Sequence, residues 1–266
     1  MTLLRTAPPG ARPTARAGAS RSRVLTPTVG VLVTVALWWF GTTVLAGSSS
    51  LLAAFAPQRA VPAAVALFAR GVLLDDIVTS LWRLLVGLLI ATVAGVVVGL
   101  AVGSVAVLDD ATRPVFQLLR MISPLSWAPV AIGLFGIGHR PVIFLVAAAA
   151  IWPVVLNTSA GVRAVDPGLT LVARSLGATR PETLTSIVLP AIRADLLTGV
   201  RLALGIGWVV LVPAEMLGVA SGLGYEILNA RDQLAYDQVM AVILVIGLLG
   251  YLLDALARWA LGGRRR

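Results

Sequence analysis

The stretch LLVGLLIATVAGVVVGLAVGSVAVL, residues 84–108, contains no charged residue. A helix needs about 20 mostly apolar residues to cross the hydrocarbon core of a bilayer. This stretch is long enough, so it predicts a membrane-spanning helix. Its small residues recur at three- and four-residue spacing, which favours close packing against a second helix; they are Ala91, Ala94, Gly95, Gly99 and Gly103.

Other parts of the chain share this character. Hydrophobic residues make up 58% of the sequence, and the mean hydropathy is +0.94. The uncharged runs are continuously apolar rather than alternating, which argues against a β-barrel. We therefore expect an all-α polytopic membrane protein with six transmembrane helices, at about 28–46, 78–106, 116–137, 141–161, 194–219 and 238–260.

The two ends of the chain differ from this middle. Residues 1–26 are rich in Arg, Pro, Ala, Ser and Thr, and predict a disordered basic tail. Residues 27–261 form the expected membrane domain, and 262–266 form a short basic tail. The first apolar run could instead be a signal peptide with a cleavage site at VLAG, 44–47, but it is long for that role.

The basic residues indicate the orientation. All 21 are arginines, because the sequence contains no lysine. If the N-terminus is cytoplasmic, sixteen arginines face the cytoplasm and five face outward, which is the asymmetry expected of membrane proteins. Both termini and the loop 162–193 are then cytoplasmic. Membrane topology accounts for the net charge of +9 without nucleic-acid binding. The five outward arginines are Arg59, Arg70, Arg83, Arg140 and Arg231.

Several chemistries are excluded. A P-loop needs a lysine, so any ATP-driven step requires a separate chain that binds the ATP. The absence of cysteine excludes disulfides and thiol catalysis. With a single histidine, no metal-ligand cluster and no nucleophile–base pattern, we expect no metal, no cofactor and no enzyme site in this chain.

The cytoplasmic loop carries clear helix signals. Asp166 and Pro167 predict a helix start, and Gly177 predicts its end in the left-handed conformation. Thr179 and Glu182 have the spacing of a capping box, so a second short helix follows and ends near Leu189-Pro190. The first helix has an apolar face of Leu169, Val172, Ala173 and Leu176.

An apolar face on such a loop has two explanations. It could lie on the lipid surface, or it could dock into a groove of a cytoplasmic partner. The residues alone do not decide between them.

The spacing Gly177, nine residues, then Ile187-x-Leu189-Pro190 resembles the EAA loop of ABC-importer permeases, EAA-x3-G-x9-I-x-LP. This chain has Leu171 at the glutamate position and Val172 at the next. The resemblance implies that the loop is a coupling helix seated in a cleft of an ATPase subunit. The residues it assigns to that contact are Asp166, Leu169, Val172, Ala173, Leu176, Gly177, Ala178, Ile187, Leu189 and Pro190.

From about 60 to 258 the chain is similar to permeases of the nitrate, sulfonate and taurine branch. The matching motifs are SLWRLLVGL (80–88), NTSAGVRAVDP (157–167), PAEMLG (213–218), SGLGYEI (221–227) and ILVIGLLGYLLD (243–254). Three others look more like the nitrate, cyanate and bicarbonate permeases: ISPLSWAPVAI (122–132), IWPVVLNT (151–158) and LGIGWVVLVPAEML (204–217).

This resemblance implies a type I ABC importer in a bacterial plasma membrane. A homodimer of the chain would carry a small anion, two ATPase subunits would bind the ATP, and an extracytoplasmic substrate-binding protein would deliver the cargo. The rival functions are a sulfonate or taurine importer, an autonomous anion channel or ion-coupled secondary transporter, and an intramembrane enzyme.

Polar residues within the apolar runs are candidates for the pathway, because leaving them in lipid is costly. Packing at an interface or bonding to the residue's own helix is the alternative for each. Glu215 lies thirteen uncharged residues beyond Arg201, inside or at the edge of the membrane, and we expect a structural or gating partner for it. We expect Glu215→Gln to preserve assembly and change transport. The pathway candidates are Ser123, Ser126, Trp127, Trp152, Asn157, Thr158, Trp208 and Glu215.

His139 and Arg140 fall in the expected outer turn before the fourth span. They could help to dock the binding protein or simply flank a helix.

Overall fold

The computed structural model describes residues 19–44 and 50–261. Residues 1–18 of the expected tail 1–26, and the expected tail 262–266, lie outside the described residues. The chain forms two units, residues 1–57 and 58–266. In the first unit, α1 (Ala19–Thr43) begins within the segment expected as a tail, and α2 (Ser50–Ala54) follows it. The indole nitrogen of Trp38 donates a hydrogen bond to the carbonyl oxygen of Phe55 at 3.1 Å.

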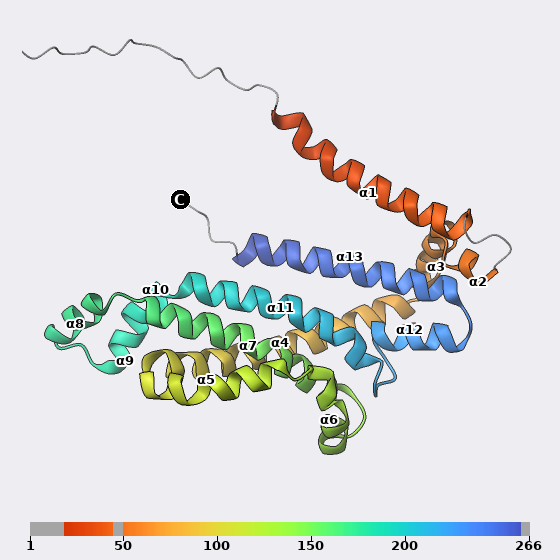
Figure 1. The fold of residues 1–266 in the computed structure, drawn as a ribbon. Helices are drawn as coiled ribbons and strands as arrows, with labels where there is room; N and C mark the ends of the chain where they lie inside the picture. The colour runs from red at the N-terminus through yellow and green to blue at the C-terminus, as the bar shows by residue number, and fades with distance from the viewer. Residues whose placement is uncertain (1–18, 45–49, 262–266) are drawn as a thin grey trace, which may run out of the picture. The chain divides into compact units, whose positions relative to one another are not determined.

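The second unit is helical throughout (Figure 1), and every regular element of the described residues is a helix. Its elements are α3 (Pro57–Ala69), α4 (Val72–Ser104), α5 (Ala106–Met121), the 3-10 helix η1 (Pro124–Trp127), α6 (Ala128–Phe135), α7 (His139–Ala164), α8 (Pro167–Ser175), α9 (Arg180–Thr183), the π-helix η2 (Leu184–Val188), α10 (Leu189–Ala191), α11 (Arg193–Glu215), α12 (Leu223–Asp232) and α13 (Tyr236–Leu261).

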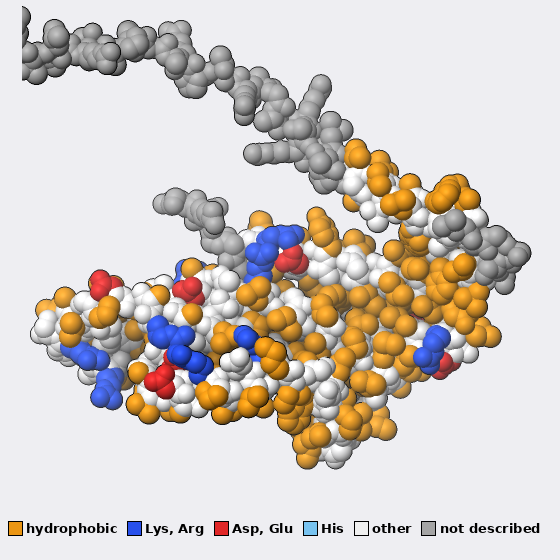
Figure 2. All heavy atoms as spheres, in the orientation of Figure 1, with side chains coloured by type: hydrophobic (Ala, Val, Ile, Leu, Met, Phe, Trp, Pro, Cys, Tyr) orange, Lys and Arg blue, Asp and Glu red, His pale blue; other side chains and the backbone are white. Residues whose placement is uncertain are grey.

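Four described helices, α4, α7, α11 and α13, are long and apolar enough to cross a membrane. The number becomes five if the bent pair of α5 with η1 and α6 counts as one span. The apolar part of α1, Thr28–Thr43, is shorter than the length required. The chain is thus a multi-pass helical membrane protein. On the face drawn in Figure 2, hydrophobic side chains cover much of the surface of these helices.

The expected third span at 116–137 is not a single straight helix. Helix α5 ends at Met121, and the chain turns by 88° before the segment 124–135. Ile122 and Ser123 are extended, with ψ of 128° at both residues. A proline disfavours the helical conformation of the residue before it, so Pro124 forces Ser123 out of the helix. A new helix can start at Pro124, because the first helical turn tolerates the missing N–H.

Helices α4, α7 and α11 pack on one another and form the centre of the unit. The small residues of α4 lie against α7, as their spacing predicted. A Cβ atom built on Gly87, Gly95 or Gly99 would come within 2.7, 2.7 and 2.6 Å of side-chain atoms of Val146, Val154 and Thr158, respectively. Larger residues at these glycines would therefore force the two helices apart.

Candidate functional site

The loop 162–193 has the predicted capping geometry. The Asp166 carboxylate accepts a hydrogen bond from the backbone N–H of Gly168 at 2.8 Å, at the start of α8. Gly177 has a φ of +85°, in the left-handed region. Glu182 accepts from the backbone N–H of Thr179 at 2.7 Å, which completes the capping box and holds the pKa of Glu182 below its ordinary value. The second helical segment runs on through the π-helix to Ala191, slightly past its predicted end.

The predicted apolar face of α8 divides into two parts. Ala173 is buried. Leu169, Val172 and Leu176 point outward, with 52%, 59% and 82% of their surfaces exposed. Leu171, at the glutamate position of the EAA pattern, is also exposed. Beyond the hinge, Ala178, Ile187 and Leu189 are half-buried, whereas Pro190 is exposed. The loop thus presents large apolar side chains without covering them itself.

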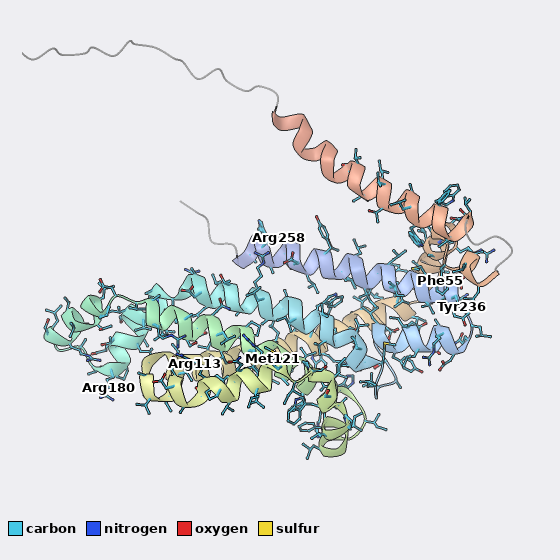
Figure 3. The ribbon with its side chains drawn as sticks, in the orientation of Figure 1. Phe55, Arg113, Met121, Arg180, Tyr236 and Arg258 are labelled. Carbon is cyan, nitrogen blue, oxygen red and sulfur yellow. The ribbon has the colours of Figure 1, made fainter. Side chains whose placement is uncertain are left out.

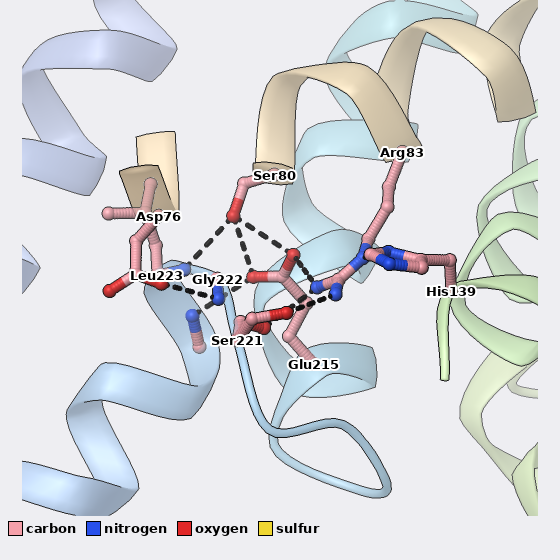
Figure 4. Close-up of polar contacts among 9 residues, drawn as sticks. Asp76, Ser80, Arg83, His139, Glu215, Ser221, Gly222 and Leu223 are labelled. Atoms are coloured by element: carbon pink, nitrogen blue, oxygen red, sulfur yellow. Dashed lines mark hydrogen bonds and ion pairs between the residues drawn. The ribbon is translucent and has the colours of Figure 1, made fainter. Parts of the chain in front are cut away.

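A buried polar network joins the ends of α4 and α11 (Figure 4). Arg83 Nη1 donates to Glu215 Oε1 at 2.7 Å, and both side chains are almost fully withdrawn from solvent. The Ser80 hydroxyl donates to the same carboxylate at 2.8–2.9 Å. The expected partner of Glu215 is therefore Arg83, which lies inside α4 rather than in an outer loop. The sequence did not pair these residues, because they are 132 positions apart.

The motif SGLGYEI (221–227) contributes further hydrogen bonds to this network. Arg83 donates to the carbonyl and hydroxyl oxygens of Ser221 at 2.8 and 2.7 Å. The backbone N–H of Gly224 donates to Glu215 at 3.0 Å, and that of Leu223 donates to Ser80 at 3.0 Å. Because these donors are backbone groups, the polypeptide itself must pass very close to the carboxylate.

Glycine is required at two points of this close approach. Gly222 has a φ of +101°, and a Cβ there would lie 2.5 Å from Glu215 Oε1. Its N–H donates to Asp76 Oδ1 at 2.7 Å. A Cβ on Gly224 would lie 2.2 Å from the carbonyl oxygen of Val212.

His139 and Arg140 have different surroundings. Arg83 Nε donates to His139 Nδ1 at 2.9 Å, so this ring nitrogen acts as an acceptor. The ring of His139 also meets Trp82 edge-on, with 5.4 Å between centroids. His139 therefore joins the start of α7 to the buried network. Arg140 is exposed.

A cavity of about 700 Å³ lies between α5, η1, α7 and α11. Three of the predicted pathway residues line it: Trp127, Trp152 and Asn157. The amide of Asn157 donates to the carbonyl oxygen of Pro153 at 2.8 Å, so its N–H group is partly engaged within its own helix. Arg120, which the sequence did not single out, lines the same cavity.

The other pathway candidates do not line this cavity. Ser123 and Ser126 are exposed at the bend. Trp208 is buried, and its indole packs against Gly250 of α13. Thr158 is fully buried against Gly99, and no residue of the described chain bonds to its hydroxyl oxygen. Glu215 belongs to the buried network.

The long apolar helices define the chain as a multi-pass membrane protein. The family model of the binding-protein-dependent transport system inner membrane component matches residues 91–264. The chain belongs to this family, which confirms the resemblance. It is therefore a transporter component and not an enzyme.

The names of three relatives mention different substrates. A nitrate import permease protein of Leptolyngbya laminosa is 36% identical over 68% of this chain and 65% of its own length. A taurine transport system permease protein of Escherichia coli is 33% identical over 88% of this chain and 86% of its own length. A bicarbonate transport system permease protein of Synechococcus elongatus is 36% identical over 68% and 66%, respectively. The chain thus spans just under two thirds of the nitrate and bicarbonate relatives.

Proposed function

We propose that this chain is the permease subunit of an ATP-driven importer for a small anion of the nitrate, sulfonate, taurine, cyanate or bicarbonate class. Two copies would form the pathway, with six spans each and both termini in the cytoplasm. Separate ATPase subunits would bind the ATP, and an external binding protein would deliver the anion. Family membership and the names of the relatives support this proposal.

The single observation that carries the coupling step is the exposed apolar side of α8. Leu169, Val172 and Leu176 are all more than half exposed. Burying one such side chain contributes about 1.5–3 kcal/mol. Their position between the Asp166 cap and the Gly177 turn suits a rigid short helix seated in a groove of a partner.

Transport would proceed by alternating access. ATP binding would favour one state of the ATPase pair, and the docked loop would pass this difference to α11 through the segment 180–192. A ligand shifts such an equilibrium only by its difference in affinity for the two states. The Arg83–Glu215 pair ties α4 to α11, so these helices would move together.

Reconstitution tests this proposal. Liposomes containing the chain, its ATPase and its binding protein should accumulate nitrate, taurine or bicarbonate only when ATP is present on the ATPase side. The matched control contains the chain alone. If the chain alone conducts the anion down its gradient at the same rate, it is an autonomous channel and the importer proposal is wrong.

A further inference from the structure

Helix α5 is strongly amphipathic. Its polar residues Asp109, Arg113, Gln117 and Arg120 follow the i, i+4, i+8, i+11 spacing of one helix face. The opposite face carries apolar side chains that are well exposed, among them Val107 at 77% and Leu118 at 71%.

The polar face is directed toward α7. Arg163 of α7 donates to Asp109 at 2.9 Å, and Arg113 donates to the other oxygen of that carboxylate at 2.7 Å. The rings of Phe116 and Trp152 meet with 5.5 Å between centroids. A helix lying on the membrane surface would instead turn its polar side away from the apolar spans.

Helices α5 and α7 do not pack tightly against each other. No residue of α5 is buried. A second cavity of about 170 Å³ lies between its polar face and α7, lined by Asp109, Arg113, Gln117, Arg120 and Arg163 among others. Arg120, Trp152 and Leu156 also line the larger cavity, so the two cavities adjoin along this face.

The charge on this face is positive. Three arginines line the smaller cavity, and Asp109 is the carboxylate among its lining residues. Arg113 and Arg163 share that carboxylate. Within the described residues, no carboxylate lies at ion-pair distance from Arg120, which stands where the two cavities meet. Arg113 is labelled on α5 in Figure 3.

From these observations we infer that the polar face of α5 is the wall of a water-filled route for the anion, and that Arg120 is its anion-selecting residue. This inference rests on the proposed function and names the part of the chain that meets the substrate. The guanidinium of Arg120 supplies donors and charge without a paired acid. The neighbouring Arg113 and Arg163 are partly neutralised by the carboxylate that they share. The route therefore attracts anions without binding them tightly.

The chain contains no cysteine, so a single introduced cysteine can be labelled without background from other thiols in the chain. Gln117→Cys on the polar face and Leu118→Cys on the opposite face are each introduced into the full chain in its complex. They are treated with an anionic sulfonatoethyl and a cationic trimethylammonioethyl methanethiosulfonate. We expect Gln117→Cys to react at least about tenfold faster than Leu118→Cys, because water reaches one face and lipid the other.

Charge selection is measured as the ratio of the labelling rate of the anionic reagent to that of the cationic reagent. Each rate is first divided by the rate at which the same reagent labels free cysteine. At Gln117→Cys we expect the anionic reagent to be favoured by about tenfold. Adding Arg120→Gln should reduce this preference at least about threefold. Adding Arg258→Gln should not, because Arg258 lines neither cavity.

Either of two results overturns the inference. Equal labelling of Gln117→Cys and Leu118→Cys means that α5 has no wet face, and an unchanged ratio in Arg120→Gln means that Arg120 does not select anions. Co-purification of the ATPase with the same samples reports separately on the proposed function.

Discussion

Arg83 and Glu215 form an ion pair at 2.7 Å with 1% and 0% of their side chains exposed. Each charge needs the other, because a buried charge without a partner is strongly destabilising. His139, Ser80, Ser221 and the N–H of Gly224 bond to the remaining polar atoms of the pair.

Removing one member of this pair should destabilise the protein. We expect Glu215→Gln to lower the free energy of unfolding by about 3–5 kcal/mol, since it leaves Arg83 without its counter-charge. This revises the sequence-based expectation that the variant assembles normally. The double variant Arg83→Gln with Glu215→Gln should recover part of the loss. Thermal unfolding in detergent measures both, and a double variant no more stable than the single one would contradict the account.

Gly222→Ala should prevent normal folding, because the new methyl group would lie 2.5 Å from Glu215 and the residue would be held at a φ of +101°. The expected readout is a loss of monodisperse protein after purification. Gly205→Ala is the matched control, because a Cβ at Gly205 has no neighbour within 4 Å. Equal yields of the two variants would show that the close approach is absent.

Thr158→Val should leave transport unchanged. The Thr158 hydroxyl oxygen is buried without a partner in the described residues, so its removal should leave the free energy of unfolding equal or raise it by about 1 kcal/mol. Anion uptake and thermal unfolding check this result. A large loss of uptake with intact folding would mean that the hydroxyl meets the substrate after all.

Thr179→Ala should loosen the start of α9. The capping box contributes about 1 kcal/mol locally, so amide hydrogen exchange over residues 180–184 should accelerate about fivefold. Glu182 adds a pH dependence: its pKa is lowered in the folded state, so its contribution is present above the ordinary pKa and is lost as the pH falls through the lowered value. Exchange that is equally fast in both proteins at neutral pH would contradict the capping role.

Features set by neighbouring residues were predictable from sequence. The Asp166 cap, the Gly177 turn and the Thr179–Glu182 box depend on a few adjacent positions, and the structure confirms all three. The small-residue face of α4 was likewise predictable from its period.

Features that need the tertiary fold were not predictable. Pro124 lies within the expected third span, but its position alone does not show whether the span kinks or turns by 88°. The pairing of Arg83 with Glu215 depends on how α4 meets α11, and a single sequence has no local signal for that. Helix α12 was missed because its ten residues are too few and too polar to resemble a span.

We propose above all that the loop 166–190 couples this permease to an ATPase. The most direct measurement is quantitative mass spectrometry of proteins that co-purify with the tagged chain from its own membranes in mild detergent. We predict a P-loop ATPase at close to one copy per chain, and its loss from Gly177→Val, because valine strains the turn at φ +85°. Purification of a folded chain without any ATPase, or the same ATPase yield from Gly177→Val, would contradict the claim.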